Sequence, residues 1–77
     1  MTIQSLKQVK EKRIKLVKEA RSTLEMTQQE LADLLGVTQR TINSYEGGKK
    51  YSKAYAVLFE ALAQHPKRTV RLINAAL

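Results

Sequence analysis

Four polar side chains between residues 39 and 44 carry hydrogen-bonding groups that suit the edges of nucleic-acid bases. If this stretch is helical, they lie within one arc, because successive residues of an α-helix turn by about 100°. Arginine can donate two hydrogen bonds to guanine, glutamine and asparagine can pair twice with adenine, and serine can bond to either. The candidate base-reading residues are Gln39, Arg40, Asn43 and Ser44.

Two short helices must position these side chains. The segment TQQE begins with Thr27 and is typical of a capping box, in which threonine accepts from the amide three residues later and a glutamate reaches back. Gly36 is expected to end this helix in a left-handed conformation, which glycine adopts at little cost. Thr38 can cap the following helix, which is expected to end at the glycine pair 47–48. This arrangement indicates a helix-turn-helix motif.

Apolar residues recur at helical spacing through most of the chain, and strand patterning is nearly absent. We expect a first helix at about 4–23. Ser52 can cap a fourth helix, and Pro66 suits the first turn of a fifth at about 66–77. The sequence therefore predicts an all-α, five-helix single domain spanning 1–77, with its helix-turn-helix core at 27–47.

The apolar stripes define the expected core. One stripe of the first helix includes Val9, and Tyr45 and Phe59 fall at core spacing in the third and fourth helices. For Tyr51 two alternatives stay open, a place in the core or stacking on a nucleic-acid base. The other residues expected to face inward include Leu31, Leu34, Leu35, Ile42, Ala54, Val57, Leu58 and Leu62.

Composition restricts the function. The 77 residues carry a net charge of +7, which favours a polyanionic partner. Cysteine is absent and histidine occurs once, so no metal site is expected, and we predict neither an enzyme nor a cofactor. No segment has the apolar length of a membrane span or the pattern of a secretory signal, so a cytoplasmic location is expected. The lysines of the first helix could form a phosphate-binding arm, a membrane-surface helix or a solvated face.

The stretch MTQQELADLLGVTQRTINSYEGGKK resembles the helix-turn-helix of the Cro/repressor-type regulators, also called the XRE family. The resemblance implies a five-helix domain that binds double-stranded DNA and regulates transcription, commonly as a repressor and a homodimer on a palindromic operator. A five-helix bundle whose third helix merely has a solvated polar face is the alternative. The matching residues are Met26, Thr27, Gln28, Glu30, Leu31, Ala32, Leu35, Gly36, Val37, Thr38, Ile42, Glu46 and Gly48.

The resemblance also implies roles for individual residues. Gln39, Arg40 and Ser44 match base-reading positions, with Asn43 beside them, and Gln28 matches a position that contacts phosphate and braces the first reader. Arg21 and Glu46 match a partly buried ion pair, although two independent surface charges are the alternative. The residues expected to position the phosphate backbone through side chains or amides are Thr27, Gln28, Thr38, Gly47, Gly48, Lys49 and Lys50.

Three residues depart from the family pattern. Glu25 replaces a frequent glycine between the first two helices, so either a positive φ costs roughly 1 kcal/mol or the turn differs. Tyr51 lies near a usual proline, which is expected to leave the approach to the fourth helix less fixed. Gly47 makes a double glycine and is expected to loosen the backbone there.

The C-terminal segment YSKAYAVLFEALAQHPKRTVRLINAAL is similar to the end of the small antitoxin-like branch of the family. In that branch the protein binds a toxin and represses its own operon, which gives an alternative function as a protein-interaction module. A helix break at His65-Pro66 would account for the same residues. The last helix is also the candidate dimer interface, through Leu72, Ile73, Ala76 and Leu77.

Overall fold

The computed structural model describes the chain from Ile3 to Ala76, with side chains from Val9 onward. The predicted all-α fold is confirmed: the described residues form five helices and no strand. The helices are α1 (Ile3–Thr23), α2 (Gln28–Leu35), α3 (Gln39–Glu46), α4 (Lys53–Gln64) and α5 (Pro66–Ala76).

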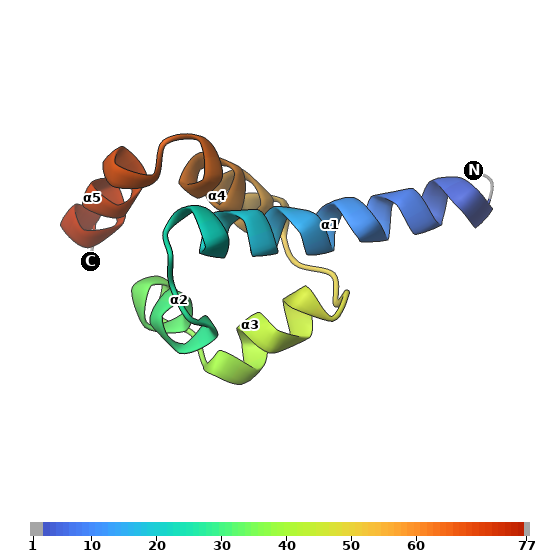
Figure 1. Ribbon diagram of the computed structural model, residues 1–77, viewed down its shortest axis with the longest axis horizontal. Coiled ribbons are helices and arrows are strands. Elements are labelled where there is room, and N and C mark those ends of the chain that lie inside the picture. Colours follow the sequence, from blue (N-terminus) through green and yellow to red (C-terminus); the bar gives the residue numbers. More distant parts are fainter. Residues whose placement is uncertain (1–2, 77) are drawn as a thin grey trace.

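The longest helix, α1, runs through the middle of the molecule, with α2 and α3 on one side and α4 on the other (Figure 1). Helix α5 packs on α4 and α2. The N-terminal half of α1 projects beyond the other helices, which gives the molecule its extents of 42 × 23 × 20 Å (Figure 1). The buried hydrophobic core contains Val17, Ala20, Leu31, Ala32, Ile42, Tyr51, Phe59 and Leu62.

The capping residues predicted from the sequence define the helix ends. Thr27 forms the reciprocal capping box of α2, and Gly36 ends that helix with φ of 72°. Thr38 accepts from the amide of Thr41 at 3.2 Å and so begins α3. Ser52 accepts from the first turn of α4, whose N-terminus it caps. Each N-cap side chain satisfies an amide at the start of its helix, and the amide of Gly36 donates to carbonyls at the end of α2. These boundaries therefore depend on short-range interactions.

The turn between α1 and α2 takes the first of the two geometries considered from the sequence, with a positive φ at Glu25. Glu25 adopts φ of 54°, the one positive φ of a non-glycine residue in the described chain. Its amide donates to the carbonyl of Ser22 at 3.0 Å, and the amide of Met26 donates to the carbonyl of Arg21 at 3.1 Å. The turn therefore caps α1 as a glycine would, with a glutamate in the left-handed position.

Three apolar residues expected in the core are exposed instead. Val57 is 63% exposed and Ala54 is also exposed, because Phe59 and Leu62 direct the opposite side of α4 inward. Val9 is 43% exposed. It lies in the first half of α1, the half that projects past the other helices (Figure 1).

Tyr51 corrects the expectation that the approach to α4 is poorly fixed. Its side chain is 8% exposed, and its hydroxyl donates to the carbonyl of Arg13 at 2.7 Å. The ring centroid lies 5.1 Å from that of Phe59 and 5.2 Å from that of Tyr45, both in tilted or edge-on geometry. A buried aromatic ring therefore takes the place of a proline in holding the loop against α1.

Within residues 3–76, no helix has the length and apolarity needed to cross a membrane.

Candidate nucleic-acid interface

Helix α3 divides into a buried side and an exposed polar side. Ile42 is fully buried, and Tyr45 packs against the core. Gln39, Arg40 and Asn43 are exposed, and Ser44 is half-buried. The arc predicted from helical periodicity therefore faces solvent, because the apolar residues of the same helix hold the other side against the core.

The exposed arc is connected to α2 by one hydrogen bond. The side-chain amide of Gln28 donates to Oδ1 of Asn43 at 3.3 Å, so this glutamine contacts the middle of α3. The bond leaves the NH₂ group of Asn43 free to donate, and a carbonyl oxygen has a second lone pair available. Arg40 forms no ion pair within the described part of the chain, so its guanidinium remains available to a partner.

The N-terminus of α2 holds a negative charge next to the predicted phosphate contacts. The carboxylate of Glu30 accepts from the backbone N–H of Thr27 at 3.0 Å, and the Thr27 hydroxyl accepts from the N–H of Glu30 at 3.1 Å. The hydrogen bond from the Thr27 backbone, followed by that with its side chain, lowers the pKa of Glu30. The Thr27 hydroxyl and the Gln28 side-chain amide can still donate to a phosphate here, next to this carboxylate.

Arg21 and Glu46 lie in direct contact between α1 and the last residue of α3. Nε and Nη2 of Arg21 donate to the two carboxylate oxygens of Glu46, each at 2.9 Å. Nη1 of Arg21 also donates to the carbonyl of Met26 at 3.4 Å. Glu46 is 9% exposed, so its charge depends on this two-point contact for compensation.

Three of the backbone amides expected to contact phosphate after α3 form hydrogen bonds within the chain instead. The amides of Gly47, Gly48 and Lys49 all donate to carbonyls of the last turn of α3, at 3.0–3.1 Å. Gly47 has helical geometry, with φ of −85°, and donates twice, so it does not loosen this backbone. Gly48 is buried with φ of 109°, a conformation that favours glycine. Because these three amides are already used, an anion at this loop would be bound chiefly by the exposed side chains of Lys49 and Lys50.

Lys49 and Lys50 are exposed at this loop, and α1 supplies a further basic residue. Nη2 of Arg13 donates to the carbonyl of Gly48 at 3.3 Å. Sequence reasoning did not single out Arg13. A signal was present, because Arg13 lies four residues before the core residue Val17 and so on nearly the same side of α1.

The predicted dimer interface on α5 is partly exposed. Leu72 is 62% exposed and Ala76 is exposed, whereas Ile73 is half-buried and packs against the core. Leu77 lies outside the described residues. A shallow apolar groove adjoins this part of α5, lined by Leu35, Ala54, Tyr55, Leu58, Ile73 and Ala76.

Two short helices with a Gly-containing turn, braced by α1 and presenting a polar face, define a helix-turn-helix protein. Comparison with protein families agrees: residues 17–62 match the model of the helix-turn-helix family. The match covers more than half of the chain, and the chain belongs to this family, in its XRE-type branch. The protein is therefore a regulator of transcription that binds double-stranded DNA. No curated protein matches the chain. No solved structure matches it either.

Proposed function

We propose that this protein reads a specific DNA sequence by inserting α3 into the major groove. The observation that carries the proposal is the exposed arc of Gln39, Arg40 and Asn43 on a helix whose opposite side is buried through Ile42. An α-helix fits the major groove of B-DNA, and side chains from its N-terminal half meet base edges there first. Arg40, which forms no ion pair with the described side chains of residues 9–76, is the strongest candidate to read a guanine.

Phosphate contacts position the protein on the duplex in this proposal. Thr27 and Gln28, at the start of α2, approach one stretch of the DNA phosphate backbone. Thr38 approaches the same stretch from the start of α3. Gly48 turns the chain so that Lys49 and Lys50 reach a second stretch. These contacts hold register and orientation and carry little sequence information. The two ends of the helix-turn-helix thus lie against the phosphate backbone of the DNA, while α3 reads the bases between these two contacts.

Repression is the regulatory action proposed. A protein that occupies a site overlapping a promoter blocks access by occupancy alone, whereas activation requires an additional surface that contacts polymerase. The DNA-binding domain described above needs no additional surface to occupy such a site. A reporter gene controlled by the operator would show lower expression with the protein present than without it, and higher expression would contradict repression.

A homodimer on a palindromic operator is proposed because one recognition helix covers few base pairs. The exposed apolar residues Leu72 and Ala76, beside the groove at Leu58, support α5 as the interface. Two copies related by a two-fold axis would place two α3 helices about 34 Å apart, one turn of DNA. The operator would then show inverted half-sites at that spacing.

The decisive experiment is selection from a random duplex library on the purified protein at moderate salt, followed by sequencing. Recovery of an inverted repeat with half-sites about one helical turn apart supports a dimeric, sequence-specific reader. Recovery of duplexes with no common motif overturns sequence reading, because charge attraction alone retains DNA without preference.

A toxin-binding role is the second candidate function. The exposed apolar side chains of Val57 on α4 and Leu72 on α5 favour it, since they offer contact area that the core does not use. This role predicts a stoichiometric complex with a co-transcribed toxin that survives high salt. Co-expression should restore growth to cells that produce the toxin, and Leu72→Asp should abolish the rescue. Failure of the unaltered protein to rescue growth would contradict the role.

A further inference from the structure

A lysine of α1 lies on the backbone of the loop after α3, although the two are 38 residues apart in the chain. The side chain of Lys10 passes directly over Gly48, and its Nζ atom lies 3.4 Å from where a Cβ atom on Gly48 would be. A Cβ atom at Gly48 would also lie 3.5 Å from Cδ1 of Ile14 in α1. The absence of a side chain at Gly48 therefore lets an ammonium group of α1 approach the loop that carries Lys49 and Lys50.

Arg13 brings a second positive charge to the same place. Its Nη2 donates to the carbonyl of Gly48, while its Nε is buried and has no hydrogen-bond partner among the described residues. The hydroxyl of Tyr51 donates to the backbone carbonyl of Arg13 at 2.7 Å. Arg13 is thus fixed on the loop by neutral groups, and its charge is not balanced by the contacts it makes.

No carboxylate compensates these cations in the described part of the chain. Glu46 at the end of α3 is fully engaged by Arg21, and neither Glu11 nor any other described acid forms an ion pair with Lys10 or Arg13. Like charges held close together repel one another, and a polyanion relieves that repulsion. The cluster of Lys10, Arg13, Lys49 and Lys50 is called the α1–loop cluster below.

We propose that the α1–loop cluster is a binding site for the phosphate backbone of DNA, built jointly by α1 and the loop after α3. The inference rests on the proposed function and deepens it by assigning phosphate binding to Lys10 and Arg13. The site also adds donors from α1 to a loop in which the amides of Gly47, Gly48 and Lys49 already cap α3. The projecting half of α1 continues past this loop, so the contact lies at the edge of the recognition site (Figure 1).

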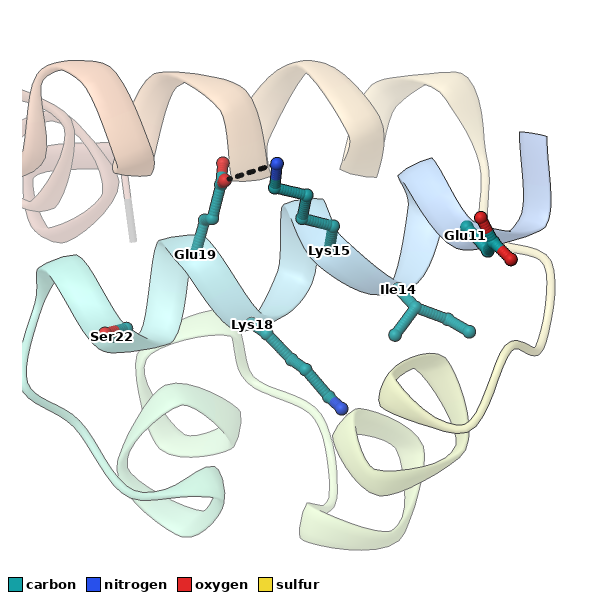
Figure 2. A pocket seen from close by; sticks show the side chains of 6 residues that line it. All are labelled: Glu11, Ile14, Lys15, Lys18, Glu19 and Ser22. Carbon is teal, nitrogen blue, oxygen red and sulfur yellow. Dashed lines mark ion pairs between the residues drawn. The ribbon is translucent and has the colours of Figure 1, made fainter. Parts of the chain in front are cut away.

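Lys15 offers a matched control for Lys10 on the same helix. Lys15 forms an exposed ion pair with Glu19, with Nζ 3.7 Å from the carboxylate. The side chains of Lys15 and Glu19 lie on the side of α1 away from those of Ile14 and Lys18, which point toward α3 (Figure 2). Lys10→Gln and Lys15→Gln therefore remove the same charge from exposed helical positions, but only the first removes it from the cluster.

The test measures duplex affinity against salt for the wild-type protein and both variants, on the selected operator and on an unrelated duplex. Lys10→Gln is expected to lower the slope of log affinity against log salt by about 0.9 on both duplexes. Its deficit relative to wild type should then shrink about threefold between about 50 and about 200 mM salt. Lys15→Gln should change the slope clearly less.

Equal slopes for the two variants would overturn the α1–loop cluster while leaving the proposed function intact. Wild-type binding to both duplexes with equal affinity would instead overturn sequence reading, and the Lys10 and Lys15 comparison would still decide the cluster. Wild-type protein that binds neither duplex at low salt would overturn both. Melting curves of the free variants, expected to match wild type, separate lost contacts from lost folding.

Discussion

Arg21 and Glu46, 25 residues apart, join the end of α1 to the end of α3 through two parallel hydrogen bonds of 2.9 Å. The contact lies directly behind the proposed reading helix and sets its position relative to the long helix. The Glu46 carboxylate is also at the C-terminal end of α3, where the helix dipole disfavours negative charge. The orientation of α3 therefore depends on Arg21.

Replacing Arg21 with methionine should reduce the free energy of unfolding by about 2–4 kcal/mol, because Glu46 would remain buried without a partner. Urea denaturation of wild type and variant measures this loss. The exposed pair of Lys15 and Glu19 provides the control, since Lys15→Met should cost less than about 1 kcal/mol. A similar loss of unfolding free energy for both substitutions would show that the buried pair stabilises the fold no more than the exposed one.

Replacing Glu25 with glycine should stabilise the protein by about 1 kcal/mol. The φ of 54° at this residue is strained for a side chain with a Cβ atom and costs glycine nothing. Thermal unfolding should show a melting temperature about 4–8 °C higher. Glu25→Ala removes the same charge and keeps the Cβ atom, so it should give little of this gain; a lower melting temperature for the glycine variant would refute the strain.

Replacing Tyr51 with phenylalanine should cost about 1 kcal/mol, because the carbonyl of Arg13 loses its hydrogen bond while the ring still fills the core. Chemical denaturation measures the loss. Tyr55→Phe is the control, as its ring joins the same aromatic cluster and its hydroxyl forms no hydrogen bond within the described residues. Equal stability of the two variants would argue against Tyr51 as an anchor of the loop.

The same tyrosine predicts a dependence of stability on alkaline pH. Burial raises the pKa of Tyr51 above its usual value near 10, despite the opposing effect of Arg13. The folded form binds this proton more tightly than the unfolded form. The contribution is therefore complete below the unfolded pKa and is lost as pH rises through the folded one. The stability difference between wild type and Tyr51→Phe should shrink above about pH 10; a constant difference would contradict the raised pKa.

Two substitutions at the interface should separate base reading from phosphate contact. Arg40→Ala should lose about 1–3 kcal/mol of discrimination at one operator position, and Lys49→Ala should weaken binding to all duplexes evenly. Competition assays against operators altered one base pair at a time measure both. Equal losses on every duplex after Arg40→Ala would exclude its base-reading role.

The helices could be predicted well because their ends depend on neighbours in the chain. Thr27 and Thr38 each accept a hydrogen bond from the amide three residues later, and Gly36 supplies the left-handed turn. The exposed arc of α3 followed from the positions of Ile42 and Tyr45 in the same helix. Val57 was wrongly expected in the core. Helix α4 is apolar on several sides, so periodicity alone could not identify the side that Phe59 and Leu62 bury.

The sequence by itself determined the helix-turn-helix and the direction in which α3 presents its polar side chains, since capping and helical periodicity act over three or four residues. Tertiary structure decided what surrounds that helix. It buried Tyr51 and brought Arg13 to Gly48 across 35 residues. Such contacts depend on how α1 packs against the loop after α3. A pattern of neighbouring residues does not encode contacts between segments this far apart in the sequence.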